Sequence, residues 1–346
     1  DASDYAIHAA LLNQLGATYA ALGQFPQAEQ VYNQNLEDHT NTLAPAHPGS
    51  KTQSLQGLAK LYGLKQALTL ALDKAQQAAA DYANHPSGDQ EQAQQQRTLA
   101  HLQLWIIQQG LHKQSLKANE VMTTAFQAMQ QAHGSQRMQA LQQTALQLTA
   151  ADPDTRKQLQ TLWQQQARLH QLDQAYVSII GQTSDEAVNK TKQLQQDRQQ
   201  TLQEIQQLDT HLRQNLLVYA QLLQPKALSI AEVQALLKPD EALLVWVMAS
   251  AETVAAEHST LMVIRAEHEP HLYTLNIRPP ALSRALTDPQ TGLLTALADP
   301  AKPIDLNLAY GLYQQLLAPA EAELVGVKHL LAVTDGVFKT CPYRYC

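Results

Sequence analysis

Hydrophobic residues recur at helical spacing along most of the chain before position 228. Leu99, Leu102 and Ile106 are one example, because they return every three or four positions and so share one face of an α-helix. After position 228 the apolar residues gather instead in short runs with β propensity, separated by turn residues. The pattern therefore predicts a mainly helical N-terminal part, followed by a C-terminal part in which strands alternate with helices.

Two stretches near the N-terminus can be laid over each other. At an offset of 43 residues, five positions fall on five others: Leu12, Leu15, Gly16, Tyr19 and Ala28 on Leu55, Leu58, Ala59, Tyr62 and Ala71. Gly23 suits the end of a first helix, and Phe25-Pro26 suits the start of a second, where the missing N–H of proline costs nothing. Small residues at Gly16 and Ala28 would let the two helices approach closely. The stretch therefore predicts a helix–turn–helix unit.

This pattern resembles a tetratricopeptide repeat, and the tail "LAPAHPGS" resembles the longer-period variant of kinesin light chains. The second copy departs from the pattern, since Gln66 stands where the turn glycine is expected. A generic alanine-rich helical hairpin is the alternative interpretation. We assign residues 1–88 to tetratricopeptide-like repeats. Residues 89–150, which are rich in Gln and Ala and keep the helical spacing, are assigned to diverged helical repeats.

The segment "ADPDTRKQL" marks the next boundary. Asp152-Pro153 would stop one helix, and Asp154 or Thr155 would cap the following one. Thr183 with Glu186 forms a capping box for a further helix, which would end at Pro225.

These signals predict an antiparallel helical hairpin over residues 151–225. Apolar residues return there by threes, fours and sevens. A free dimeric coiled coil is the alternative, although faces rich in glutamine specify a coiled-coil register poorly.

The pattern of the C-terminal part predicts an α/β domain. A short helix and a Pro-Asp turn lead to a strand over Ala242–Met248, and two more strands, Leu261–Arg265 and His271–Ile277, are joined by "AEHEP". A helix follows that Pro319 interrupts or ends. The run "VKHLLAVTDG" then predicts a buried strand that leads into a loop, in a sheet of parallel type.

The order of these segments and their amino-acid sequences resemble the CHAT domain, a member of the caspase-like (separase-related) group of cysteine peptidases. The last matching piece is "LAYGLYQQLLAPAEAELVGVKHLLAVTDGVFKTCPY". The residues that carry the match are Leu312-Tyr313, Leu317-Ala318-Pro319, Leu330–Val333, Asp335-Gly336 and Pro342-Tyr343. Thr334 departs from the proline that is usual before Asp-Gly. We assign residues 228–346 to the N-terminal part of a CHAT-like α/β domain, so the expected fold class is mainly α with an incomplete α/β caspase-like domain.

The resemblance implies a family of regulated cysteine peptidases in which repeats recruit a protein partner, a frequent bacterial architecture. In such peptidases the catalytic His and Cys come from later strands, and this chain stops at Cys346. We therefore expect residues 1–346 to be catalytically silent, with no catalytic, cofactor-binding or metal-binding residue. A non-enzymatic tetratricopeptide scaffold that binds a peptide or helix is the alternative.

The two cysteines, Cys341 and Cys346, are weak candidates for chemistry. By the resemblance, Cys341 occupies an apolar position before a proline, so it is a packing residue and not a nucleophile paired with His329. The C-x4-C pair has no second pair of ligands for zinc. A disulfide between them is possible but would organise little of the chain.

The segment "EHEPH" places four possible metal ligands near a strand turn: Glu267, His268, Glu269 and His271. A solvated hairpin tip is the favoured interpretation. His47 and His85 each precede a proline at comparable repeat positions. This placement indicates boundaries between helical segments and not a catalytic role. The dipeptide Asp335-Gly336 predicts a turn in preference to a functional site.

Composition narrows the function classes. The net charge is −7, with 24 basic and 31 acidic residues well mixed, which gives no basic surface for nucleic acid. No apolar run approaches the roughly 18–20 residues of a membrane span. The opening "DASDYAIHAALLNQL" lacks an initiator Met and the regions of an intact signal peptide, so we expect a processed or incomplete chain and assign it to the cytoplasm. The expected partner is a protein or peptide bound by the repeats.

Overall fold

The computed structural model describes residues 2–41, 49–84, 90–148, 153–179, 185–215, 227–249, 259–298 and 303–334. The chain divides into two compact units. The first holds Asp1–Pro86, Gln94–Gly134 and Ala227–Cys346, and the second holds Ser87–Ala93 and Ser135–Lys226. Most of the described residues are helical, and a small mixed sheet lies near the C-terminus, which confirms the prediction of a mainly α chain with an α/β part.

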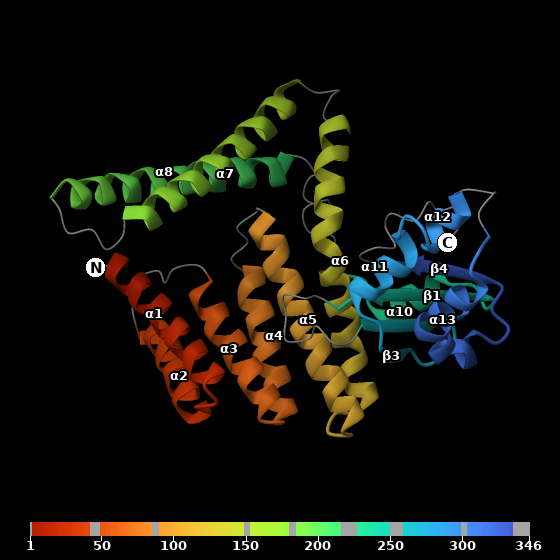
Figure 1. The fold of residues 1–346 in the computed structure, drawn as a ribbon. Coiled ribbons are helices and arrows are strands. Elements are labelled where there is room, and N and C mark those ends of the chain that lie inside the picture. The colour runs from red at the N-terminus through yellow and green to blue at the C-terminus, as the bar shows by residue number, and fades with distance from the viewer. Residues whose placement is uncertain are drawn as a thin grey trace. The chain divides into compact units, whose positions relative to one another are not determined.

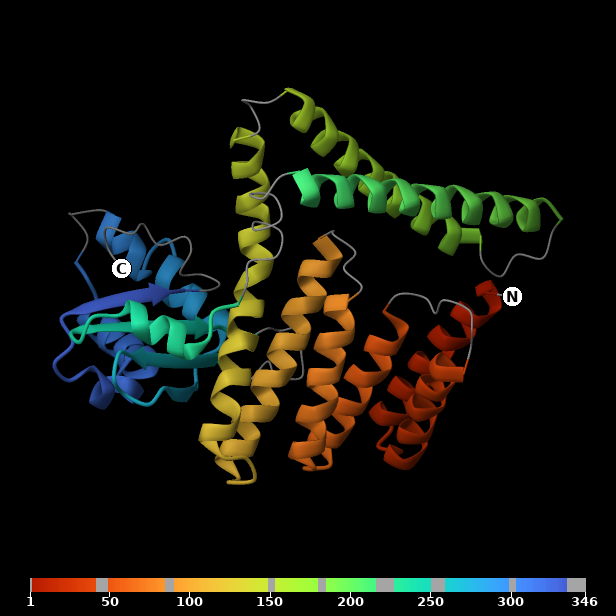
Figure 2. The ribbon, with the colours of Figure 1, turned by 180° about the vertical axis from the view of Figure 1, so that it is seen from behind.

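The N-terminal helices form consecutive pairs that run side by side (Figures 1 and 2). Their bounds are α1 Ala2–Ala21, α2 Phe25–Asn41, α3 Ser50–Leu64, α4 Leu68–Asn84, α5 Gln90–His112 and α6 Ala118–Leu148. Helix α1 ends just before Gly23, and α2 begins at Phe25-Pro26, as predicted.

The same turn closes each of these helix pairs. Gly23, Gln66 and Gln114 all take positive φ, at 73°, 63° and 55°. In each turn this residue donates its amide to the carbonyl three residues earlier at 3.1 Å, and the next residue donates to the carbonyl five residues earlier at 2.9 Å. This pair of hydrogen bonds is the Schellman motif, which satisfies backbone carbonyl groups at the end of a helix. The turn therefore keeps its geometry although Gln66 stands in place of the expected glycine. The turn between α5 and α6 has the same geometry.

Tyr32 of α2 fills the narrow space between α1 and α3. A Cβ added to Gly16 would lie 2.7 Å from the ring, and one added to Gly57 would lie 2.3 Å from it. The predicted close approach at Gly16 is thus confirmed. Leu12 and Tyr19, two of the aligned repeat positions, are half-buried.

The apolar stripe expected along α5 and α6 is buried. Side chains from both helices join one core cluster with the earlier pairs: Leu102, Ile106, Val121, Met122, Phe126 and Met129. The stripe is therefore helix packing, as its spacing predicted.

The C-terminal part contains a four-stranded sheet in the order β3-β2-β1-β4. The strands are β1 Glu241–Val247, β2 Ser259–Arg265, β3 His271–Leu275 and β4 His329–Val333, and α10 Ile230–Leu236 precedes them. In the described sheet only the β1–β4 pairing is parallel, and β2 pairs antiparallel with both β1 and β3. The expectation of a parallel-type sheet is wrong here. The short turn between β2 and β3 cannot hold the crossover that parallel strands need.

Helices cover one face of the sheet. They are α11 Pro279–Thr287, α12 Leu293–Ala298, α13 Leu306–Leu316 and the 3₁₀ helix η2 Ala318–Leu324. Leu282 and Leu312 pack there against Leu244 and Leu261. Helix α13 ends before Pro319, as predicted, since the proline opens η2.

The opposite face of the sheet packs on α5 and α6. Val245 and Met262 belong to the same core cluster as Ile106 and Phe126. Hydrogen bonds cross the same boundary: Gln108 Nε2 donates to Thr260 Oγ1 at 2.6 Å, and His133 Nε2 lies 2.8 Å from the Trp246 carbonyl oxygen. The helix pairs and the sheet therefore share one core, and the sheet is sandwiched between two helical layers.

Strand β4 was predicted to be buried, and this is wrong. Leu330 is 51% exposed and Leu331 is 46% exposed. The strand pairs with β1 on one side and forms the border of the described sheet. An apolar strand sequence alone cannot distinguish a central strand from such an edge.

The second unit is dominated by α7, Pro153–Ile179, and α8, Asp185–Asn215. Leu162, near the start of α7, packs with Leu212, near the end of α8, so the two helices run antiparallel. Helix α7 begins at Pro153 itself, which corrects the predicted cap at Asp154 or Thr155. Proline is favoured at the first helical position because its φ is already helical. Thr183 and Pro225 lie outside the described residues.

None of the described helices combines the length and the hydropathy that a membrane span requires.

Candidate functional site

Three polar side chains share one face of α3. Gln53, Gln56 and Lys60 are spaced by three and four residues, so they lie along one side of the helix. We call these three residues the α3 face. Lys60 is half-buried, and burial lowers the pKa of its ammonium group. Among the described residues no carboxylate forms an ion pair with Lys60, so the cation is desolvated without compensation.

Amide side chains connect the α3 face to the neighbouring helices. Asn13 Nδ2 of α1 donates to Gln53 Oε1 at 3.3 Å, and Gln95 Nε2 of α5 donates to Gln56 Oε1 at 3.3 Å. The two glutamines accept through oxygen, and no described residue accepts from their Nε2 groups. Primary amides carry both donors and acceptors. We call Asn13, Gln53, Gln56 and Gln95 the amide row. The Nε2 groups of Gln53 and Gln56 remain donors that could pair with the carbonyl groups of a bound peptide.

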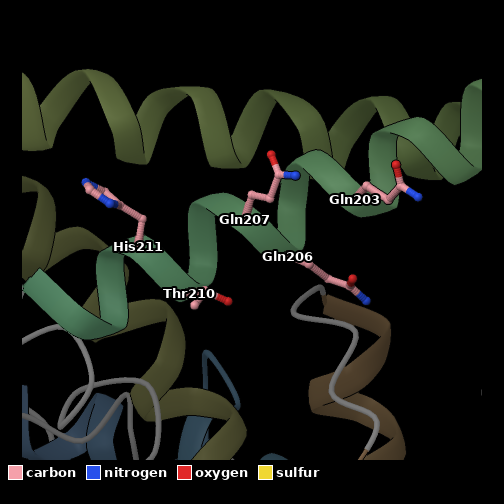
Figure 3. Close-up of a pocket in the computed structure, with 5 residues that line it drawn as sticks. All are labelled: Gln203, Gln206, Gln207, Thr210 and His211. Carbon is pink, nitrogen blue, oxygen red and sulfur yellow. The ribbon is translucent and has the colours of Figure 1, made fainter.

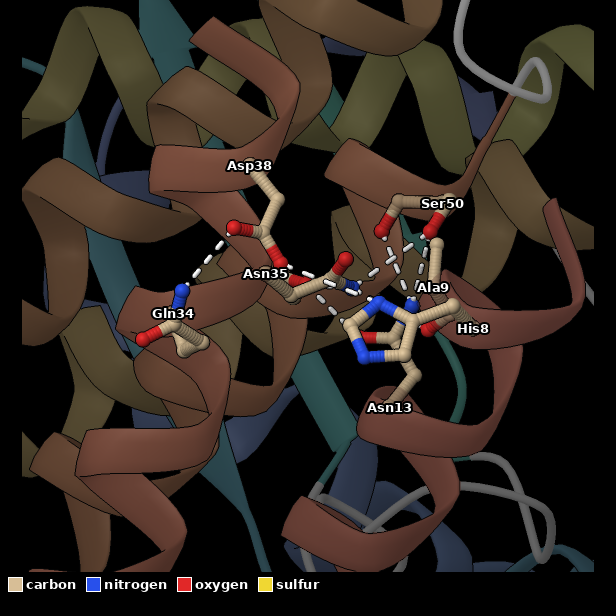
Figure 4. Close-up of polar contacts among 8 residues, drawn as sticks. His8, Ala9, Asn13, Gln34, Asn35, Asp38 and Ser50 are labelled. Atoms are coloured by element: carbon tan, nitrogen blue, oxygen red, sulfur yellow. Dashed lines mark hydrogen bonds and ion pairs between the residues drawn. The ribbon is translucent and has the colours of Figure 1, made fainter. Parts of the chain in front are cut away.

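A buried hydrogen-bond network holds Asn13 in place (Figure 4). Ser54 Oγ donates to Asn13 Oδ1 at 2.6 Å, and Asn35 Nδ2 of α2 donates to Ser54 Oγ at 2.8 Å. Asn13 Nδ2 also donates to the Ser50 carbonyl at 3.0 Å. Because these residues come from α1, α2 and α3, the network fixes the three helices relative to one another. Its role is structural, and it orients the amide row.

A second polar cluster joins α2 to α3. Tyr62 Oη donates to Glu29 Oε1 at 2.9 Å, and Lys65 Nζ donates to Glu29 Oε2 at 2.8 Å. The Lys65 bond lowers the pKa of Glu29. Burial, together with the bond to Glu29, raises the pKa of Tyr62 to about 12. Each polar group here already has its partner, so the cluster is a helix clamp with no vacant ligand position.

The possible metal ligands at the β2–β3 turn do not converge. Glu267, His268 and Glu269 are exposed, and His271 Nδ1 lies 3.4 Å from Glu323 Oε2 of η2. No group of three His, Cys, Asp or Glu side chains that could hold a metal ion occurs in the part of the chain that the structure describes. The turn therefore offers no metal site among those residues.

The other sequence candidates give no assembled site. His329 begins the exposed edge strand β4. Cys341, Cys346 and Asp335-Gly336 lie outside the described residues, as do His47 and His85. Their predicted roles stay predictions.

Two open hollows lie along α8 in the described part of the second unit. One of about 370 Å³ is lined by Gln203, Gln206, Gln207, Thr210 and His211 (Figure 3). A second of about 430 Å³ shares Gln207 and His211 and reaches Thr161 and Gln165 of α7. Both are open to solvent, and most of the residues that line them have neutral polar side chains. They lack the enclosure that small-molecule sites usually have.

Comparison with known proteins adds no assignment: no family model matches the chain, and no curated protein or solved structure matches it significantly. The tetratricopeptide and CHAT resemblances remain predictions from the sequence.

Sequence reasoning missed the α3 face. Two glutamines and a lysine on a helix are the usual composition of a solvated surface, and nothing in their spacing separates them from one. Only the stacking of α1, α3 and α5 shows that Gln56 and Lys60 are withdrawn from water and that amides connect the helices.

Proposed function

We propose that the helical part is a protein-interaction module of tetratricopeptide type, joined to a CHAT-like α/β part. The observation that carries the proposal is the repeated turn at Gly23, Gln66 and Gln114, with the same φ sign and the same pair of hydrogen bonds each time. Stacked helical hairpins of this kind present extended surfaces that bind peptides.

The binding surface in this proposal is the α3 face with the amide row. A peptide in extended conformation offers backbone carbonyl groups to the Nε2 donors of Gln53 and Gln56. An acidic side chain of the peptide lies against Lys60, whose half-buried ammonium group has no carboxylate partner among the described residues. Such a contact offsets the desolvation of the lysine and selects for negative charge. The proposed ligand is thus an acidic, extended protein segment.

The C-terminal part supports the CHAT proposal through its order of elements. Helix α10, β1, the β2–β3 pair, α13 and β4 occur in the order of the segments on which the resemblance rests, with α11 and α12 between β3 and α13. In that family the repeats would recruit the substrate or regulator of a cysteine peptidase. We assign no catalytic residue to residues 1–346, because neither cysteine matches the family's nucleophile.

A selection from a displayed peptide library against the full chain tests the binding proposal. We expect enrichment of acidic sequences, and we expect Lys60→Glu to abolish capture of the enriched pool. Lys328→Glu is the matched control, because Lys328 is an exposed lysine in the α/β part and its replacement changes the net charge equally. A pool without acidic enrichment, or a pool that both variants capture equally, would contradict the proposed site.

The scaffold alternative differs from the peptidase family in one measurable respect. We expect the chain of residues 1–346 to cleave none of the enriched peptides. Cleavage that is lost after alkylation of Cys341 and Cys346 would overturn this expectation and assign a peptidase activity to the chain itself.

A further inference from the structure

The three lysines of helix α3 and its C-cap differ in what holds their ammonium groups. Lys51 Nζ lies 3.2 Å from Asp81 Oδ1, and Lys65 Nζ lies 2.8 Å from Glu29 Oε2. Lys60 lies between them in the sequence, and no described residue forms an ion pair or a hydrogen bond with its Nζ. Lys51 and Lys65 are exposed, whereas Lys60 is half-buried. Lys60 is therefore the lysine of this helix that is withdrawn from water without a carboxylate.

This environment favours the neutral amine of Lys60. Only a neutral amine has the free electron pair that attacks an acyl group. A carboxylate partner stabilises the ammonium form of a lysine, and burial without such a partner disfavours it. Burial accordingly lowers the pKa of Lys60. At neutral pH a larger fraction of this amine is in the reactive form than in a solvated lysine.

The neighbours of Lys60 suit a neutral amide better than a cation. Gln56 precedes Lys60 by four residues, so the two side chains are neighbours on the helix. Gln56 Oε1 already accepts from Gln95 Nε2 at 3.3 Å, and no described residue accepts from Gln56 Nε2. This Nε2 group can donate to the carbonyl oxygen of an acylated lysine. Acylation would thus remove an uncompensated charge and place an acceptor beside a donor.

We propose that Lys60 is an acylation site for a small acyl phosphate, and that its acylation prevents the α3 face from binding an acidic segment. The Nζ atom attacks the carbonyl carbon of the acyl phosphate, so a C–N bond forms while the bond from that carbon to the phosphate oxygen breaks. Phosphate leaves with the electron pair, and the proton of Nζ passes to solvent. The second half of the proposal rests on the proposed function, because the neutral amide has no positive charge to attract a carboxylate.

Peptide mapping by mass spectrometry tests the first half in the absence of any bound peptide. The full chain is treated with acetyl phosphate at neutral pH and digested at successive times. We expect Lys60 to be acetylated severalfold faster than Lys51 and Lys65, although both of these are more exposed. In guanidinium chloride the three rates should become alike, because the fold creates the difference. Equal rates in the folded chain, or a preference for Lys60 that persists after unfolding, overturn the proposal.

Capture of the enriched acidic peptide pool by the acetylated chain tests the second half. We expect the loss of capture to follow the acetylated fraction of Lys60. Lys65→Arg is the matched control, because it removes a neighbouring amine outside the α3 face and keeps the positive charge. Acetylation should abolish capture by this variant as it does for the wild type.

The outcomes separate the two halves of the proposal. Full capture by a chain acetylated at Lys60, or capture that Lys65→Arg preserves after acetylation, overturns the regulation of the α3 face. A selection without an acidic pool contradicts the proposed function and, with it, this regulation. The acylation of Lys60 is decided by the peptide mapping alone, so it can stand when the proposed function fails.

Discussion

At the scale of single residues, the helix stack depends on glycines that make room for Tyr32. A Cβ at position 57 would lie 2.3 Å from Tyr32 Cζ, closer than side chains tolerate. We therefore expect Gly57→Ala to lower the free energy of unfolding by about 1–3 kcal/mol, as overpacked core substitutions do. Urea unfolding followed by circular dichroism measures the change.

Gly311 of α13 is the matched control. It also lies within a helix, but an added Cβ would meet no atom within 4 Å. Gly311→Ala should raise the free energy of unfolding by roughly 0.5–1 kcal/mol, because alanine has the better helix propensity. If both substitutions change stability alike, the ring of Tyr32 does not limit the approach of α2 to α3.

Gln66 holds the left-handed conformation that Gly23 holds in the first pair. A side chain in this conformation costs roughly 1–2 kcal/mol. We expect Gln66→Gly to stabilise the protein by about 0.5–1 kcal/mol, after the greater freedom of glycine in the unfolded chain is subtracted. Gln109→Gly, inside α5, should instead destabilise it. A loss of stability in Gln66→Gly would show that the turn makes other contacts through this side chain.

Glu29 gives the helix clamp a pH dependence. Its folded-state pKa lies below the ordinary 4.5, because Lys65 and Tyr62 bind the carboxylate. A lowered pKa means that the clamp contributes its full stability above pH 4.5 and loses it as pH falls through the folded-state pKa.

Glu29→Gln should therefore cost up to about 1 kcal/mol at pH 7, the range of partly exposed ion pairs. The difference from wild type should shrink below pH 4. Unfolding curves at both pH values measure this. A cost that stays constant from pH 7 to pH 3 would show that the charge of Glu29 contributes nothing.

At the scale of elements, local signals located most helix ends and strands. Gly23 and Phe25-Pro26 mark a turn through backbone preferences that act within a few residues, so sequence alone could predict them. The exposure of β4 could not be predicted in this way, because the burial of a strand depends on which strands flank it. Tyr32 was missed for a similar reason, since its two glycine partners lie on other helices, 16 and 25 positions away in the sequence.

At the scale of the whole first unit, the helices and the sheet depend on one another. Helical periodicity alone predicts that the helices before position 226 fold without the rest. The structure instead indicates that the helices need the sheet. Ile106 of α5 and Phe126 of α6 share a core cluster with Val245 and Met262 of the sheet. Removal of the sheet would expose this apolar face to water.

We therefore predict that a fragment of residues 1–226 melts at a lower temperature than the full chain and binds the dye ANS. Thermal circular dichroism and dye fluorescence measure the two effects. A fragment that melts like the full chain and binds no dye would show that the sheet is an independent appendage.

The proposed function of the molecule as a whole depends on a peptide binding at the α3 face. Hydrogen–deuterium exchange of the full chain, with and without the tightest peptide from the library selection, locates that surface directly. We predict slower exchange along α3, Ser50–Leu64, and in the facing turns of α1 and α5, and no change in α3 for Lys60→Glu. Slower exchange confined to α7 and α8, or to β4, would contradict a binding surface on the helical repeats.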